Sequence, residues 1–108
     1  MTIELPNPVA AYFEANTRLD AGAMLAPFAA DAVVTDEERC HRGHDAIGAW
    51  IKDATLGTRA VAIPLQVEGD GAERVVTAQV SGDFPGSPVT LGFRFGLTGD
   101  RIARLEIG

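Results

Sequence analysis

The feature that most constrains the fold is a change in the spacing of apolar residues halfway along the chain. In the second half they recur at every second position, most strictly from Val89 to Leu97, where they alternate with small or polar residues. A period of two is typical of a β-strand with one buried face. Turn-forming residues at 69–71, 83–88 and 98–100 divide this half into four strands. The sequence therefore predicts a four-stranded antiparallel meander that continues to the C-terminus.

The first strand of this meander carries two alternating sets of side chains. We expect one set to be buried: Val61, Ile63, Leu65 and Val67. The other set then faces outward: Ala60, Ala62, Pro64 and Gln66. Because proline has no N–H to donate to a neighbouring strand, Pro64 further predicts an edge position or a bulge.

The first half of the chain shows helical spacing instead. Residues 6–8, Pro-Asn-Pro, open a helix that runs to about Asp20, and residues 23–28 form a short second helix that is interrupted or ended by a proline. A third helix begins at His44 and ends at Gly57. One apolar stripe runs along this third helix: Ile47, Trp50, Ile51 and Ala54.

Two short strands are predicted between the second and third helices. The first has its core at residues 32–35, where β-branched side chains are concentrated, and ends at Asp36. After a reversal, residues 39–42 form a short edge strand. The complete pattern is α+β, with three N-terminal helices packed on one face of a strongly curved, mostly antiparallel sheet.

Length and composition predict a single domain over residues 1–108, since 46% hydrophobic residues are enough for one core. The net charge of −6 argues against nucleic acid or an anionic membrane surface as partner, because both bind clustered lysine and arginine. Cys40 is the only cysteine, so no intramolecular disulfide forms. No signal peptide and no apolar run near ~18 residues is present, and we expect a soluble cytoplasmic protein.

Most catalytic motifs are missing from the sequence. There is no nucleophile elbow and no phosphate-binding or dinucleotide-binding loop. Cys40, His41 and His44 match no standard zinc spacing, so we expect neither a metal nor a cofactor. What remains is a pocket between helices and sheet, with Asp36 and Tyr12 as its polar members.

The pattern leaves two interpretations of Asp36 open. Alternation places it on the same strand face as Ala32 and Val34. If that face is buried, Asp36 is a carboxylate at an apolar interior, an arrangement found most often at functional sites. If the face is solvated, Asp36 is an ordinary turn residue, as the charged residues that follow it suggest.

Nearly the whole chain resembles the nuclear transport factor 2-like superfamily, in particular its SnoaL-like and ketosteroid-isomerase-like branch. The segments that carry the resemblance are residues 28–36, residues 43–47 with Trp50, and residues 92–95. The resemblance implies a cone-shaped α+β sheet closed by helices. It also implies a homodimer formed through the sheet.

Aligned with the ketosteroid isomerases, Asp36 falls where those enzymes keep their proton-transferring carboxylate. Tyr12 falls on their oxyanion-binding tyrosine. Their second oxyanion donor, a protonated aspartate, falls on Leu91, which can donate nothing. The resemblance therefore implies Asp36 and Tyr12 as catalytic residues, with one donor fewer than in the steroid isomerases.

Three functions are consistent with these observations. The first is an enzyme of isomerase, cyclase or dehydratase type, in which Asp36 removes a proton next to a carbonyl and Tyr12 stabilises the oxygen. The second is a dimeric binding module that holds a small hydrophobic molecule without converting it. The third is an adaptor that binds protein through its outer sheet face. The expected ligand-binding residues are Asn16, Phe28, Val34, Trp50, Leu91 and Phe93.

Two further expectations concern packing. Trp50 should be buried and should line the pocket, because its helical stripe faces the sheet. The homodimer should form on the sheet face opposite the pocket, where the side chains are small or polar: Thr90, Gly92, Arg94 and Gly96 on one strand and Ala60, Ala62 and Gln66 on another.

Overall fold

The computed structural model describes residues 4–108. The helices are α1 (Asn7–Thr17), α2 (Ala21–Leu25), α3 (Gly43–Ile51) and a π-helical turn, η1 (Lys52–Leu56). The strands are β1 (Phe28–Asp36), β2 (Arg39–Arg42), β3 (Val61–Glu68), β4 (Glu73–Ser81), β5 (Val89–Thr98) and β6 (Arg101–Ile107). Within the part of the chain that the structure describes, no helix combines the length and apolar character needed to cross a membrane.

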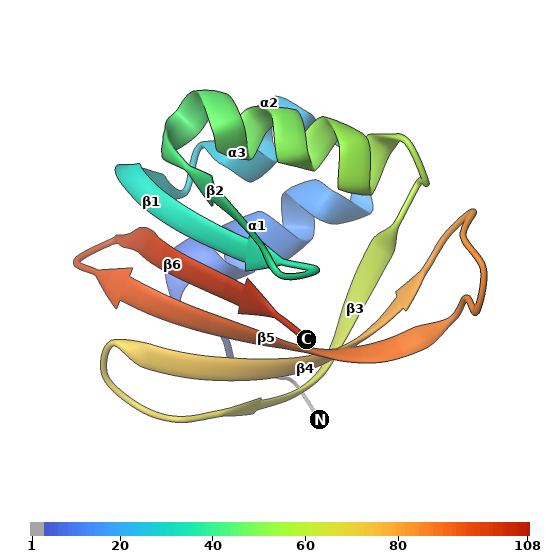
Figure 1. Ribbon diagram of the computed structural model, residues 1–108. Helices are drawn as coiled ribbons and strands as arrows, with labels where there is room; N and C mark the ends of the chain where they lie inside the picture. The colour runs from blue at the N-terminus through green and yellow to red at the C-terminus, as the bar shows by residue number, and fades with distance from the viewer. Residues whose placement is uncertain (1–3) are drawn as a thin grey trace.

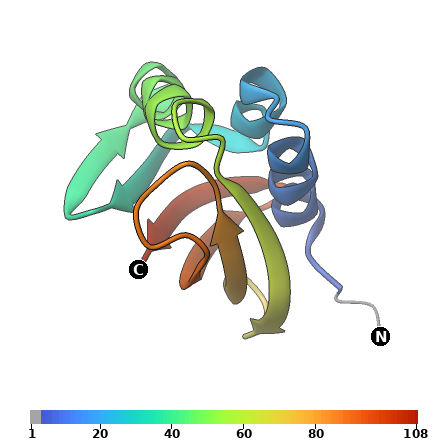
Figure 2. The same ribbon diagram turned by 90° about the vertical axis from the view of Figure 1, so that its right-hand side faces the viewer.

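All six strands form one sheet in the order β2-β1-β6-β5-β4-β3. The predicted antiparallel meander is confirmed for β3 to β6, and the predicted edge strand at Arg39–Arg42 is β2. Strand β1 pairs antiparallel with β2 but parallel with β6, which brings the two halves of the chain together. Figures 1 and 2 show this curved sheet with the helices on one side of it.

The first half of the chain departs from the prediction in two places. Only α1 and α2 precede the sheet, because α3 follows β1 and β2, so the prediction of three N-terminal helices is matched in part. Strand β1 begins at Phe28, earlier than the predicted core at residues 32–35. Phe28 is fully buried and pairs with Ile102, and the pairing is irregular between Phe28 and Val33. A buried aromatic contact thus extends the strand beyond its β-branched core.

Gly57 ends the third helical segment, as the sequence predicts, and the packing gives the reason. The π-helical turn η1 continues α3, and Gly57 N–H donates to the carbonyl of Lys52 at 2.9 Å. A Cβ atom on Gly57 would lie 2.7 Å from the carbonyl oxygen of Asp53. Such a distance is shorter than any ordinary contact, so this wide turn closes only around glycine.

Strand β3 contradicts the predicted facing at Ala62, Ile63 and Leu65, whereas beyond its register shift Val67 packs against the core and Gln66 is exposed, as predicted. Ile63 and Leu65 are 52% and 53% exposed, whereas Ala62 is buried. The cause is Asn16 on α1, whose side-chain amide donates to Ala60 O at 2.9 Å and accepts from Ala62 N–H at 2.7 Å. The helix therefore docks directly on the strand backbone beside the buried Ala62. Both expectations for the proline are confirmed, since β3 is an edge strand and its register shifts between Pro64 and Gln66.

The core lies between α1 and the sheet and is built around aromatic rings. Phe13 on α1 packs edge-to-face against two β5 residues, Phe93 and Phe95, with ring centroids 5.3 and 5.8 Å apart. Tyr12 makes the same kind of contact with Phe28 at 5.8 Å. Edge-to-face pairs stabilise beyond the area they bury, so these contacts hold α1 in one orientation over the sheet.

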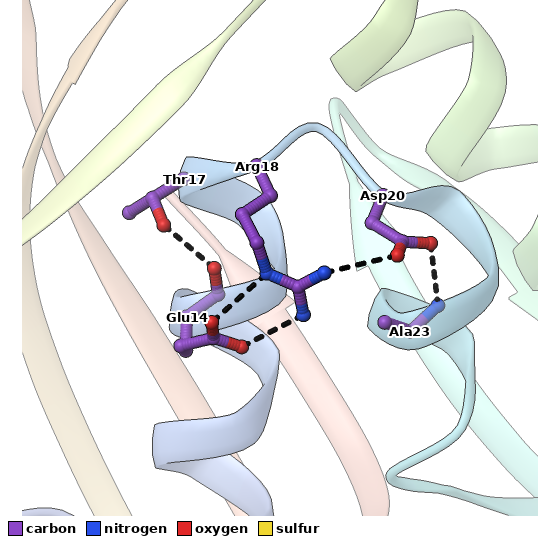
Figure 3. Close-up of polar contacts among 5 residues, drawn as sticks. All are labelled: Glu14, Thr17, Arg18, Asp20 and Ala23. Carbon is purple, nitrogen blue, oxygen red and sulfur yellow. Dashed lines mark hydrogen bonds and ion pairs between the residues drawn. The ribbon is translucent and has the colours of Figure 1, made fainter.

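The joint between α1 and α2 is a polar cluster on the surface (Figure 3). The Arg18 guanidinium donates to both carboxylate oxygens of Glu14 at 2.9 Å and to Asp20 at 3.1 Å. Asp20 also accepts the N–H of Ala23 at 3.1 Å, which makes it the N-cap of α2. Residues close together in the sequence therefore supply the polar contacts that join the two helices.

Candidate active site

A cavity of about 860 Å³ lies between α1, the α3–η1 segment and the sheet. Of the eight residues that the sequence predicts for the site, six line this cavity: Tyr12, Asn16, Asp36, Trp50, Leu91 and Phe93. The other two, Phe28 and Val34, are fully buried in the core and do not line it. Helix α1, strand β1, helix α3 and strand β5 thus each bring predicted residues to one place.

Asp36 is the last residue of β1, and its position resolves the two interpretations of this carboxylate. Ala32 and Val34, which share its strand face, are fully buried. The face is therefore the interior one, and Asp36 reaches the cavity where the strand ends. Trp50 Nε1 donates a hydrogen bond to Asp36 Oδ2 at 3.0 Å. The carboxylate is held from α3 by an uncharged donor.

Trp50 is buried and lines the cavity, as predicted. Its helical stripe places it on the side of α3 that faces the sheet, together with Ile47 and Ile51, both fully buried. Packing therefore fixes the indole ring, and the ring fixes Asp36. One residue links the core to the only carboxylate that β1 presents to the cavity.

Tyr12 enters the cavity from α1 with only 3% of its surface exposed. Its ring is held edge-to-face by Phe13, Phe28 and Phe95 at centroid distances of 5.2, 5.8 and 5.8 Å. Burial raises the pKa of the Tyr12 phenol far above its usual range, and the nearby Asp36 carboxylate raises it further. The phenol thus keeps its proton and can act as a hydrogen-bond donor at physiological pH.

Asn16 lies one turn after Tyr12 on α1, and its amide oxygen and nitrogen are already bonded to the β3 backbone at Ala60 and Ala62. Its nitrogen also lies 4.0 Å from the sulfur of Met24. Although the residue lines the cavity, its geometry is that of a clamp between helix and edge strand. A buried amide with these partners is structurally satisfied.

The sequence did not identify two cavity residues on β2. In the β1–β2 ladder Arg39 pairs with Asp36, and His41 pairs with Val34. Directly paired antiparallel residues share a face, so both side chains face the cavity, which they line. The His41 ring centroid lies 6.0 Å from that of Trp50, with the planes 32° apart.

The sequence could have indicated these two residues only through the length of the turn between β1 and β2. Glu37 and Glu38 have φ angles of 52° and 66° and form a two-residue reversal. Two-residue hairpin turns require positive φ, which is uncommon for glutamate, so the turn type was not evident from residue type. Extending the alternation of β1 across a two-residue turn would have placed Arg39 and His41 on the Asp36 face.

No family model matches the sequence, and no curated protein matches it. The fold is similar to several solved structures. A Sinorhizobium meliloti protein, provisionally named a polyketide cyclase, is 47% identical over 96% of this chain and 95% of its own, with a TM-score of 0.91.

Two more distant structures share the fold alone. A Catenulispora acidiphila protein with a ketosteroid isomerase-like fold, in complex with trimethylamine, is 19% identical over 97% of this chain and 86% of its own, with a TM-score of 0.82. A nuclear transport factor 2-like protein of unknown function from Cytophaga hutchinsonii is 10% identical over 100% of this chain and 93% of its own, with a TM-score of 0.79.

Proposed function

The chain belongs to the nuclear transport factor 2-like superfamily, in its SnoaL-like and ketosteroid-isomerase-like branch, and on that premise we propose that it is a small-molecule enzyme. Asp36 is the general base that removes a proton next to a carbonyl group. Tyr12 donates a hydrogen bond to the oxygen as negative charge develops on it. The substrate is a small, largely apolar molecule, and the reaction is of isomerase, cyclase or dehydratase type without a cofactor.

The observation that carries this proposal is the hydrogen bond from Trp50 to Asp36. It occupies Oδ2, whereas Oδ1 accepts no hydrogen bond from any residue in the range 4–108. Within the same range no ion pair joins Asp36 to a lysine or arginine. An uncharged donor orients a carboxylate without neutralising it, so one oxygen stays available as a base.

Tyr12 supports the same role from the opposite wall of the cavity. An oxyanion donor must hold its proton while charge accumulates on the substrate, and a buried phenol with a raised pKa meets that condition. The Sinorhizobium relative's provisional name favours a cyclisation. In such a reaction the carbanion formed beside one carbonyl attacks a second carbonyl of the same molecule.

Leu91 favours a second candidate, a binding module without turnover. It lines the cavity, and by the resemblance it falls on the position of the second donor of the ketosteroid isomerases. Loss of one oxyanion donor costs about 3–4 kcal/mol of transition-state stabilisation. With apolar neighbours such as Val89 and Phe93, the same cavity can hold a small hydrophobic molecule that is never converted.

Deuterium exchange distinguishes the two candidates. The protein is incubated in D₂O with a panel of small cyclic ketones, and loss of the α-proton signal is followed by NMR. We expect catalysed exchange that falls at least about 100-fold in Asp36→Asn, since a general base contributes on that order. Asp20→Asn is the matched control, because Asp20 is an exposed carboxylate remote from the cavity. Thermal stabilisation by the ketones without exchange in any variant would favour the binding module.

We also propose a homodimer through the sheet face opposite the cavity. Leu91 and Phe93 line the cavity, so the residues between and beside them on β5 face away from it: Thr90, Gly92 and Arg94. Ala60 and Ala62 must be removed from the expected interface because they line the cavity. Gly96 is covered within the chain, since a Cβ there would lie 3.0 Å from the Arg104 guanidinium. Light scattering at micromolar concentration should return twice the 11.4 kDa chain mass.

A further inference from the structure

Thr55 presents a buried hydroxyl to the cavity. It lies on η1, lines the cavity and is 6% exposed. Its hydroxyl makes no hydrogen bond with residues 4–108, although Thr58, one turn later, donates its own to the carbonyl of Ala54 at 2.9 Å. Among these residues Arg104 Nε is the only side-chain nitrogen or oxygen that is both sealed from solvent and without a hydrogen-bond partner. Since the Thr55 hydroxyl also has no partner, it is not sealed from solvent. The Thr55 hydroxyl is therefore accessible, and the accessible side of this buried residue is the cavity.

Three of the donors on the cavity wall already have partners, whereas Tyr12, Thr55, Arg39 and His41 have none among residues 4–108. The Asn16 amide is bonded to β3, the Trp50 indole to Asp36, and the Thr58 hydroxyl to Ala54. Within residues 4–108, Tyr12 and Thr55 are the two lining hydroxyls without a partner. A hydroxyl that opens on the cavity without a protein partner can donate its hydrogen bond to a ligand bound there.

Two hydrogen bonds connect the turn that carries Thr55 to the helix that carries Tyr12. The Thr55 carbonyl accepts from Ala60 N–H at 2.9 Å, and the Ala60 carbonyl accepts from the Asn16 amide at 2.9 Å. Asn16 lies one helical turn from Tyr12, so both share one face of α1. A single backbone segment at Ala60 thus connects the helix that carries Tyr12 with the turn that carries Thr55.

We propose that Thr55 is the second hydrogen-bond donor to the substrate oxygen, the role that Leu91 cannot fill, and that the substrate is a ketone or ester bound with its carbonyl oxygen at the α1–η1 end of the cavity. This inference rests on the proposed function. The α-C–H bond breaks as Asp36 Oδ1 takes the proton, and its electron pair forms the enolate double bond. The carbonyl π pair moves onto the oxygen, which accepts from Tyr12 and Thr55.

The test uses 4-nitrophenol, whose ionised and neutral forms absorb at different wavelengths, as a probe of oxyanion binding. Titrations are made in the Asp36→Asn background, which removes repulsion between the phenolate and the carboxylate. Thr55→Val should weaken phenolate binding about 10- to 100-fold, the usual effect of losing a hydrogen bond to a charged group. Thr55→Ser keeps the hydroxyl and should stay within about threefold of the parent.

Thr17→Val is the matched control, because its hydroxyl lies outside the cavity lining and is bonded to the carbonyl of Glu14, so its loss should leave phenolate affinity within about threefold. Thr55→Ala is measured alongside, in case the turn does not accommodate valine. Equal binding by the parent, Thr55→Val and Thr55→Ala would overturn the Thr55 role, while a loss in Tyr12→Phe would leave the proposed function standing. Absence of phenolate binding in the parent would overturn the oxyanion site altogether. Equal weakening in Thr55→Val and Thr55→Ser would show that the hydroxyl is not the cause.

Discussion

The molecule holds carboxylates in two different ways, with a charged partner at one site and an uncharged partner at the other. At the α1–α2 joint, Glu14 and Asp20 lie in water and share the Arg18 guanidinium (Figure 3). At the cavity, Asp36 lies at the end of a buried strand face and is held by the neutral Trp50 indole. In the first, one guanidinium offsets part of the charge of two carboxylates, and in the second an uncharged donor orients one carboxylate without offsetting its charge.

The two sites differ in how well their carboxylates can accept a proton. Arg18 holds the pKa of Glu14 below its usual value, so that carboxylate is a poor proton acceptor. The same pairing raises the pKa of Arg18. At the cavity, burial and then the Asp36 carboxylate raise the pKa of Tyr12, and Asp36 forms no ion pair among residues 4–108, although Arg39 lies opposite it on β2. An exposed ion pair supports a helix joint, whereas an unpaired carboxylate beside a buried phenol is suited to proton transfer.

The largest expected effect comes from removing the support of Asp36. Trp50→Ala should lower the free energy of unfolding by about 3–5 kcal/mol, because it removes a buried aromatic ring and leaves a cavity. Trp50→Phe should lower the free energy of unfolding by less, because it keeps most of the packing. It still loses the hydrogen bond to Asp36. Urea melts measure both. As the only tryptophan, Trp50 should also show blue-shifted emission; a water-like spectrum would contradict its burial.

The second prediction concerns Tyr12, the only tyrosine in the chain. Its folded pKa is raised by burial and by Asp36, so its contribution to stability is complete below the unfolded pKa of about 10 and is lost as pH rises toward the folded value. Wild-type stability should therefore fall with pH above about 10 by more than that of Tyr12→Phe. Absorbance of the phenolate during alkaline titration should appear only with unfolding. Ionisation near pH 10 in the folded protein would place Tyr12 in water.

At the helix joint the effects should be smaller. Asp20→Ala removes the N-cap of α2 and should destabilise by about 1 kcal/mol. Asp20→Asn keeps a capping oxygen and should cost clearly less. Thermal melts at neutral pH compare the two. Equal losses would mean that the contact with Arg18, and not the cap, is the stabilising interaction.

The smallest effect should come from Glu14→Gln, since Glu14 is exposed and its ion pair is screened by solvent. The folded pKa of Glu14 is lowered, so any stability that it contributes is present above its unfolded pKa and lost as pH falls through the folded value. The melting temperatures of wild type and variant should differ slightly at pH 7 and converge in acid or in 1 M salt. A difference that survives both conditions would contradict a surface ion pair.

Several parts of the fold and site could be predicted from local pattern. Period-two spacing located β3 to β6, the apolar stripe on α3 placed Trp50 in the interior, and Gly57 ended that helical segment. The resemblance and the spacing brought Tyr12 and Asp36 to one cavity. These features depend on residues close in sequence or on a shared family pattern.

Other features depended on contacts that no local pattern contains. The parallel pairing of β1 with β6 joins the two halves of the chain. The register that pairs Arg39 with Asp36 across the strands depended on a turn in which Glu37 and Glu38 adopt positive φ. The hydroxyl of Thr55 became a candidate donor only when the tertiary structure placed it on the cavity wall without a protein partner, unlike the Asn16, Trp50 and Thr58 donors.

The sequence by itself determined the α+β class, the order of the elements and the two alternating sets of side chains on β3. It did not determine which set is buried. A period of two is symmetric between the faces of a strand, so an edge strand can turn either face inward at similar local cost. The tertiary structure decided between them: Asn16 bonded the backbone at Ala60 and Ala62, which left Ala62 buried and Ile63 and Leu65 in solvent, and the register shift after Pro64 returned Val67 to the core.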